Sequence, residues 1–154
     1  MNWLTDLIKN PILITATSSW AIAQILKVII NAIVTKEWSL ERLFGDGGMP
    51  SGHSATVSSL AVSTALTCGT GSVEFAITAI LAIVVCHDAM GVRLETGKQA
   101  ILLNEIVELF DSLMKEQLSE IKLKEFVGHT PSQVIIGVML GVGNAFLMYY
   151  VVLH

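Results

Sequence analysis

The sequence predicts an all-α protein, a polytopic membrane bundle of about four transmembrane helices with one additional amphipathic helix. Of its 154 residues, 53% are hydrophobic and only 14% are charged, and the mean hydropathy is +0.67. Soluble domains carry about 25% charged residues, so this chain has too few charges to cover a water-facing surface. Four apolar stretches approach the roughly 20 residues that a helix needs to cross a bilayer. The length suits one membrane domain, residues 1–154.

The four expected spans are apolar runs with helix signals at their ends. The first covers residues 11–35, where Pro11 suits the first turn of a helix. The second covers 52–68 and is short and rich in Ser, Thr and Ala, so we expect neighbouring helices to enclose it. The third and fourth spans cover 73–92 and 132–153.

The segment 99–126, between the third and fourth spans, has a different pattern. Acidic residues alternate there with apolar residues at helical spacing, which is typical of an amphipathic helix. Such a helix either lies on the membrane surface or packs against a second subunit, and the sequence does not separate these two interpretations. The apolar positions are Leu102, Ile106, Leu109, Phe110, Leu113 and Met114.

Three glycines, Gly137, Gly141 and Gly143, lie in the fourth span. Small residues at this spacing let helix backbones approach closely within a bilayer. We expect them to serve packing within the chain rather than a dimer contact.

The net charge argues against one class of partner, and the cysteines argue against a cysteine-based metal site. A net charge of −4 argues against a nucleic acid partner, because binding to a phosphate backbone needs clustered Lys and Arg. Cys68 and Cys86 lie at opposite ends of their apolar segments and belong to no metal-binding motif.

Ionisable residues within apolar spans are costly and are functional candidates by default. Lys27 lies in the C-terminal half of the first span and His53 opens the second. Asp88 lies near the end of the third span, Arg93 follows it, and His129 precedes the fourth. If the spans alternate in direction, all these positions fall on one side of the membrane, so the sequence predicts one shared polar pocket.

This pocket is suited to an anion. Lys27 and Arg93 supply positive charge, and the helix starts at Gly52 and Ser132 supply backbone N–H groups that favour anions. Glycines ahead of Pro50 let the backbone fold closely around a ligand.

Two motifs resemble those of the type 2 phosphatidic acid phosphatases, membrane relatives of the vanadium-dependent haloperoxidases. Pro50-Ser51-Gly52-His53 is similar to the family's Pro-Ser-Gly-His motif. The run 128–134, which contains His129-Thr130-Pro131, resembles the family's last motif, in which a histidine precedes a glycine-rich helix. Lys27 matches the lysine of the first motif. The resemblance covers most of the chain.

The resemblance implies a chemistry for five residues. His129 would attack phosphorus and form a phosphohistidine intermediate, and His53 would protonate the leaving oxygen. Lys27, the Ser51 hydroxyl and the Gly52 backbone N–H would hold the phosphoryl oxygens. Such a site needs no metal and no cofactor.

Some positions depart from the family pattern. Gln133 replaces the aspartate that orients the nucleophilic histidine, and Leu123 replaces an arginine. These departures suggest a divergent branch of the superfamily, which the segment 88–104 also resembles. Our hypothesis is that Arg93, with Lys98, replaces the missing arginines and that Asp88 supplies the charge lost at Gln133. The alternative is a structural ion pair between Asp88 and Arg93.

The expected function is that of a membrane lipid phosphate phosphatase, acting on phosphatidylglycerophosphate or phosphatidate. The alternative is a lipid-phosphate binding or transport protein with little or no turnover. The expected location is the cell membrane, with the protein embedded in the bilayer, and a homo-oligomer is among the expected assemblies. Because cytoplasmic loops carry an excess of Lys and Arg, the pocket is expected to face the cytoplasm. On the pocket side, apart from Arg93 and Lys98, lie Lys36, Arg42, Lys115, Lys122 and Lys124, against Lys9 alone on the other side.

Overall fold

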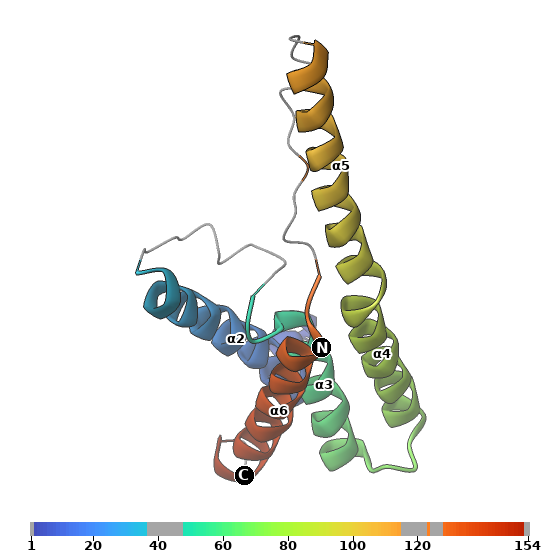
Figure 1. Ribbon diagram of the computed structural model, residues 1–154. Coiled ribbons are helices and arrows are strands. Elements are labelled where there is room, and N and C mark those ends of the chain that lie inside the picture. The colour runs from blue at the N-terminus through green and yellow to red at the C-terminus, as the bar shows by residue number, and fades with distance from the viewer. Residues whose placement is uncertain (1, 37–47, 115–122, 124–127, 153–154) are drawn as a thin grey trace.

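The computed structural model describes residues 2–36, 48–114, 123 and 128–152, and these ranges contain helices and no strands. The side chains of Arg93, Asp111, Met114 and Val152 lie outside the described part of the chain. The fold is therefore the all-α helix bundle that the sequence predicts (Figure 1). A short helix, α1 (Trp3–Ile8), which the hydropathy pattern does not indicate, precedes the bundle.

The first long helix, α2 (Pro11–Thr35), covers the first expected span. The Asn10 side chain caps its start by accepting hydrogen bonds from the backbone N–H groups of Ile12 and Leu13, at 3.0 and 3.1 Å. Pro11 follows at the first helical position, where the missing N–H costs nothing. The helix ends at Lys36, whose φ of 57° is left-handed and breaks the helical backbone.

The second long helix, α3 (Gly52–Cys68), lies at the centre of the bundle and packs against α2, α4 and α6. Ser51 caps it by accepting a hydrogen bond from the N–H of Ser54. The buried side chains of α3 are small, and most of them are Ser, Thr or Ala. This small-residue surface lets three neighbouring helices approach one short helix.

Two helices that meet almost end to end follow α3. Ser72 caps α4 (Val73–Met90), and Gly91 separates it from α5 (Val92–Met114). Figure 1 shows α5 continuing the direction of α4 and extending well beyond the other helices. The helix thus begins at Val92, seven residues before the expected start at residue 99, and the part of the expected segment beyond Met114 is outside the described residues except Leu123.

The last helix, α6 (Pro131–Leu147), ends in a π-helical turn (Met148–Val152). Its start repeats the device used by α2, because Pro131 occupies the first helical position. Gln133 reaches back to the start of the helix and accepts a hydrogen bond from the backbone N–H of Thr130 at 3.2 Å. This is the glutamine half of a capping box.

Close contact between α3 and α6 depends on two glycines. A Cβ on Gly137 would lie 2.6 Å from the Ser51 carbonyl oxygen, and a Cβ on Gly141 would overlap the Ala55 carbonyl and the Ser58 hydroxyl. At Gly143, a Cβ would meet nothing within 4 Å. Gly137 and Gly141 therefore serve packing within the chain, as expected, and Gly143 does not.

The outer surface of the bundle is apolar, as a membrane protein requires. Three helical stretches are long and apolar enough to cross a bilayer: Pro11–Thr35, Val73–Phe110 and Pro131–Val151. The 17-residue α3 is not among them, and its position at the centre agrees with the expected enclosure by neighbours. Large apolar side chains on the outer faces of α2, α4 and α6 are exposed, among them Ile25, Ile33, Ile77, Ile83, Ile135 and Met139.

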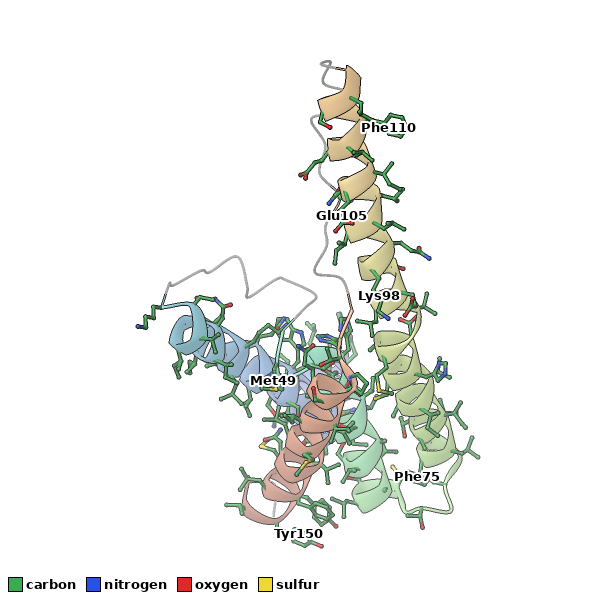
Figure 2. All side chains as sticks on the ribbon, in the orientation of Figure 1. Met49, Phe75, Lys98, Glu105, Phe110 and Tyr150 are labelled. Atoms are coloured by element: carbon green, nitrogen blue, oxygen red, sulfur yellow. The ribbon has the colours of Figure 1, made fainter. Side chains whose placement is uncertain are left out.

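The helix α5 carries a stripe of exposed apolar residues, its acidic residues Glu105 and Glu108 are exposed as well, and its amphipathic role stays a prediction. In Figure 2, Glu105 and Phe110 lie on the part of α5 that extends beyond the bundle. What covers this stripe, a membrane surface or a second subunit, stays a prediction. The exposed stripe consists of Leu102, Leu103, Ile106, Leu109, Phe110 and Leu113.

Candidate functional site

Three helix ends, the starts of α3 and α6 and the end of α4, meet beside the C-terminal half of α2. The N–H of Ser51, before α3, donates to the carbonyl oxygen of Gln133 in α6 at 3.1 Å. The N–H of His129, before α6, donates to the carbonyl oxygen of Ala89 near the end of α4 at 3.0 Å. Gly48 lies against the Lys27 side chain of α2, since a Cβ there would lie 3.2 Å from Lys27 Cγ. The sequence motifs therefore come together in space.

His129 is almost completely enclosed, with 1% of its surface exposed. Its Nδ1 lies 3.2 Å from Oε1 of Gln133. The same Oε1 accepts a hydrogen bond from the N–H of Thr130, also at 3.2 Å. A backbone N–H can only donate, so the Gln133 atom facing it must be the carbonyl oxygen rather than the amide nitrogen.

This contact decides which nitrogen of His129 carries the proton. Because Oε1 can only accept, Nδ1 must donate, and in the neutral ring Nε2 then holds the free lone pair. Nε2 is buried and has no hydrogen-bond partner among the described residues. The structure thus presents a buried basic nitrogen whose lone pair is available.

The second histidine and the lysine lie near the His129 ring. The rings of His53 and His129 are 6.2 Å apart between centroids and stand edge to face. Lys27 is 4% exposed in α2, and its charge is close enough to act on His129. Lys27 therefore places a buried positive charge near the two imidazoles.

The protonation of His129 reflects these surroundings. Burial lowers its pKa below the ordinary value of 6.5, and the positive charges of Lys27 and His53 lower it further. The hydrogen bond that Nδ1 donates to Gln133 and the nearby backbone of Gly48 oppose this shift. At neutral pH the ring is therefore uncharged, which is the state that a nucleophile needs.

The start of α3 adds hydrogen-bond donors to the pocket. The Ser51 side chain is fully buried, and its oxygen takes part in contacts with the N–H and the hydroxyl of Ser54, at 3.3 and 3.0 Å. Gly52 and His53 occupy the first two helical positions, where N–H groups have no partner within the helix. These donors and the positive end of the helix favour an anion.

Three expected site residues are placed less closely. Asp88 is half-buried in the last turn of α4, next to the Ala89 carbonyl that holds the His129 backbone. Arg93 follows at the start of α5, and its side chain is outside the described part of the chain. Lys98 lies on α5 with its ammonium 2.6 Å from Glu95, and this pair is exposed. In this structure Lys98 is therefore not part of the histidine cluster.

The structure adds two residues to those expected. Gln24 is buried in α2 one turn before Lys27, and its carboxamide faces Gly52. Asn104 of α5 binds both the N–H and the carbonyl of Leu123, at 3.0 and 3.1 Å, and so tethers the segment that leads to His129. A polar residue within an apolar span was a usable signal for Gln24, whereas nothing in the sequence pairs Asn104 with Leu123.

Within the ranges that the structure describes, no three His, Cys, Asp or Glu side chains are grouped as a metal site needs.

Comparisons with known proteins agree with these motifs. The model of a family described as "Divergent PAP2 family" matches residues 8–144. The Uncharacterized membrane protein YuiD of Bacillus subtilis (strain 168) is 35% identical over 156 residues, which cover 94% of this chain and 98% of the relative. No solved structure matches the chain.

Proposed function

Since the chain belongs to the Divergent PAP2 family, we propose that it is a membrane enzyme that removes the phosphate group from a phosphorylated lipid. The observation that carries the proposal is the buried Nε2 of His129, which has a free lone pair, in a ring that lies near His53 and Lys27. Such an arrangement suits nucleophilic attack on phosphorus better than a structural role, because a buried polar atom without a partner destabilises the fold by about 1–3 kcal/mol.

The reaction proceeds in two displacements. Nε2 of His129 attacks phosphorus, a P–N bond forms, and the bond between phosphorus and the lipid oxygen breaks while His53 donates a proton to that oxygen. The lipid alcohol leaves, and phosphohistidine remains. His53 then takes a proton from a water molecule, whose oxygen attacks phosphorus, so that the P–N bond breaks and inorganic phosphate is released.

The other pocket groups stabilise the charge on phosphorus. Lys27, the Ser51 hydroxyl and the N–H of Gly52 hold the non-bridging oxygens, as fixed donors in a site that is largely closed to water. Gln133 keeps Nε2 available by binding Nδ1, but it is neutral and stabilises an imidazolium less well than a carboxylate does.

Asp88 and Arg93 complete the proposal at the junction of α4 and α5. Asp88 supplies the missing negative charge from its place beside the Ala89–His129 contact, and Arg93 supplies positive charge for the phosphate. Assays of Asp88→Asn and Arg93→Ala, with folding verified by size-exclusion chromatography, test these roles. Full activity in both variants would contradict the proposed roles of Asp88 and Arg93.

We propose that the site lies on the cytoplasmic side of the cell membrane. The sequence segments on the pocket side carry an excess of Lys and Arg over those on the other side, as cytoplasmic loops do. A cytoplasmic site favours lipid phosphates made in the inner leaflet, such as phosphatidylglycerophosphate or phosphatidate. No nucleic acid, metal or cofactor enters the proposed reaction.

Purified protein assayed for phosphate release over a panel of lipid phosphates tests the proposal. Loss of turnover in His129→Ala and in His53→Ala supports the proposal. The matched control is Ser63→Ala, which changes a buried residue in the C-terminal half of α3. The neutral Gln133 favours a second candidate, a lipid-phosphate binding or transport protein. Tight binding without phosphate release in the wild-type protein would select that candidate.

A further inference from the structure

Gln24 holds a second buried polar atom that the proposed reaction does not use. Its side chain is 7% exposed, and its Oε1 has no hydrogen-bond partner among the described residues. The oxygen lies 3.7 Å from where a Cβ on Gly52 would stand, beside the start of α3 and one turn of α2 from Lys27. Gln24 is thus at the edge of the phosphate pocket.

The chemistry of this atom restricts what can bind it. A carboxamide oxygen accepts hydrogen bonds and cannot donate them. The oxygens of a phosphate dianion are acceptors as well, so they cannot partner Oε1. The phosphate is already provided for by Lys27 and by the N–H groups at the start of α3. The partner of Gln24 must therefore be a donor that lies next to the phosphate.

We propose that Gln24 accepts a hydrogen bond from a hydroxyl group of the substrate, on the carbon next to the one that bears the phosphate. This inference rests on the proposed function, which places the phosphate at His129. It makes Gln24 a specificity-determining residue that favours phosphomonoesters with a free neighbouring hydroxyl over those in which that oxygen is acylated. Of the two lipids named above, phosphatidylglycerophosphate has such a hydroxyl and phosphatidate does not.

The test uses two substrates that differ by a single hydroxyl group: 1-oleoylglycerol 3-phosphate and its 2-deoxy counterpart. Wild-type protein should show a kcat/KM about tenfold higher for the hydroxylated lipid, because a site built to bind a hydroxyl discriminates against its absence. Gln24→Met keeps the volume and removes the acceptor. It should lower kcat/KM for the hydroxylated lipid alone and bring the two values within about twofold of each other.

Thr15→Val is the matched control, because Thr15 is buried in the same helix and its hydroxyl donates to the carbonyl of Pro11, one turn earlier in α2. It should leave the preference unchanged. Equal rates for both lipids in the wild-type protein overturn the inference. So does an equal loss on both lipids in Gln24→Met, since Gln24 would then bind water or serve the fold.

A binding measurement separates this inference from the proposed reaction. The affinities of two non-hydrolysable phosphonates, with and without the hydroxyl, are measured by calorimetry in detergent. A hydroxyl preference that disappears in Gln24→Met supports the inference even if no lipid is turned over, in which case only the enzymatic proposal fails. Equal wild-type affinities overturn it even if the protein is an active phosphatase.

Discussion

At the scale of single residues, the protonation of His129 controls the proposed chemistry. Burial lowers its pKa below 6.5, so the neutral ring persists into mildly acidic solution. We therefore expect the acid limb of kcat/KM to lie below pH 6.5. Lys27→Met removes a charge that contributes to the lowered pKa and should move this limb to higher pH, although the remaining activity will be small. A pH profile of both proteins measures the shift, and an unchanged limb would show that another group titrates.

Gln133 offers a second test at the same scale. Gln133→Glu keeps an acceptor for the N–H of Thr130 and for Nδ1 of His129 and adds a negative charge. A carboxylate beside an imidazole raises its pKa by about one unit or more, so the acid limb should move upward and kcat should rise by about tenfold. Gln133→Met, which lacks the acceptor, should lower kcat by about a hundredfold because the proton is no longer fixed on Nδ1. A rate that is equal in all three proteins contradicts the role of Gln133.

At the scale of helices, the contact between α3 and α6 depends on Gly141. A Cβ there would overlap the Ala55 carbonyl, so Gly141→Ala should destabilise the folded protein by about 1–3 kcal/mol. Gly143→Ala is the matched control in the same helix, since its Cβ would meet nothing within 4 Å. Unfolding in mixed micelles measures the difference. Equal stability of the two variants would mean that α3 and α6 are not packed as described.

The helices also show how far the sequence could predict the structure. The starts of α2, α3 and α6 carry short signals at Pro11, Ser51 and Pro131, and local hydrogen bonds fix those ends. The expected start at residue 99 is too late for α5, because the prediction depends on apolar periodicity, which begins only at Leu102. The backbone is nevertheless helical from Val92 onward. Residues 92–101 lack the apolar pattern, but they contain no proline and include several helix-forming residues.

The residues of the candidate site were likewise predictable from the sequence only where they belong to local motifs. Lys27, His53 and His129 could be placed together because they lie in the C-terminal half of one apolar span and at the starts of two others, which alternation brings to the same side. The bond of Gln133 to His129 follows from a spacing of four residues across the start of α6. The position of Gln24 beside Gly52, and that of Asn104 beside Leu123, depend on how separate helices pack, and no local pattern contains that information.

At the scale of the whole molecule, orientation in the membrane decides which substrates can reach the pocket. If the pocket faces the cytoplasm, the opposite end of α3 faces outward. Native Cys68, which is exposed there, should react with an impermeant maleimide on intact cells in a Cys86→Ser background. Thr35→Cys, made in a cysteine-free protein, lies at the pocket end and should react only after lysis. The reverse labelling pattern would place the pocket outside.

One oxygen atom, Oε1 of Gln133, closes the first turn of α6 and also fixes the proton of His129. The reactivity of the imidazole is therefore a property of the assembled helix and not of the residue alone. A chain in which this turn has not yet formed during membrane insertion would carry both histidines and still lack an aligned lone pair. If the proposed reaction is correct, newly made protein would not react with the surrounding lipid phosphates until α6 has formed.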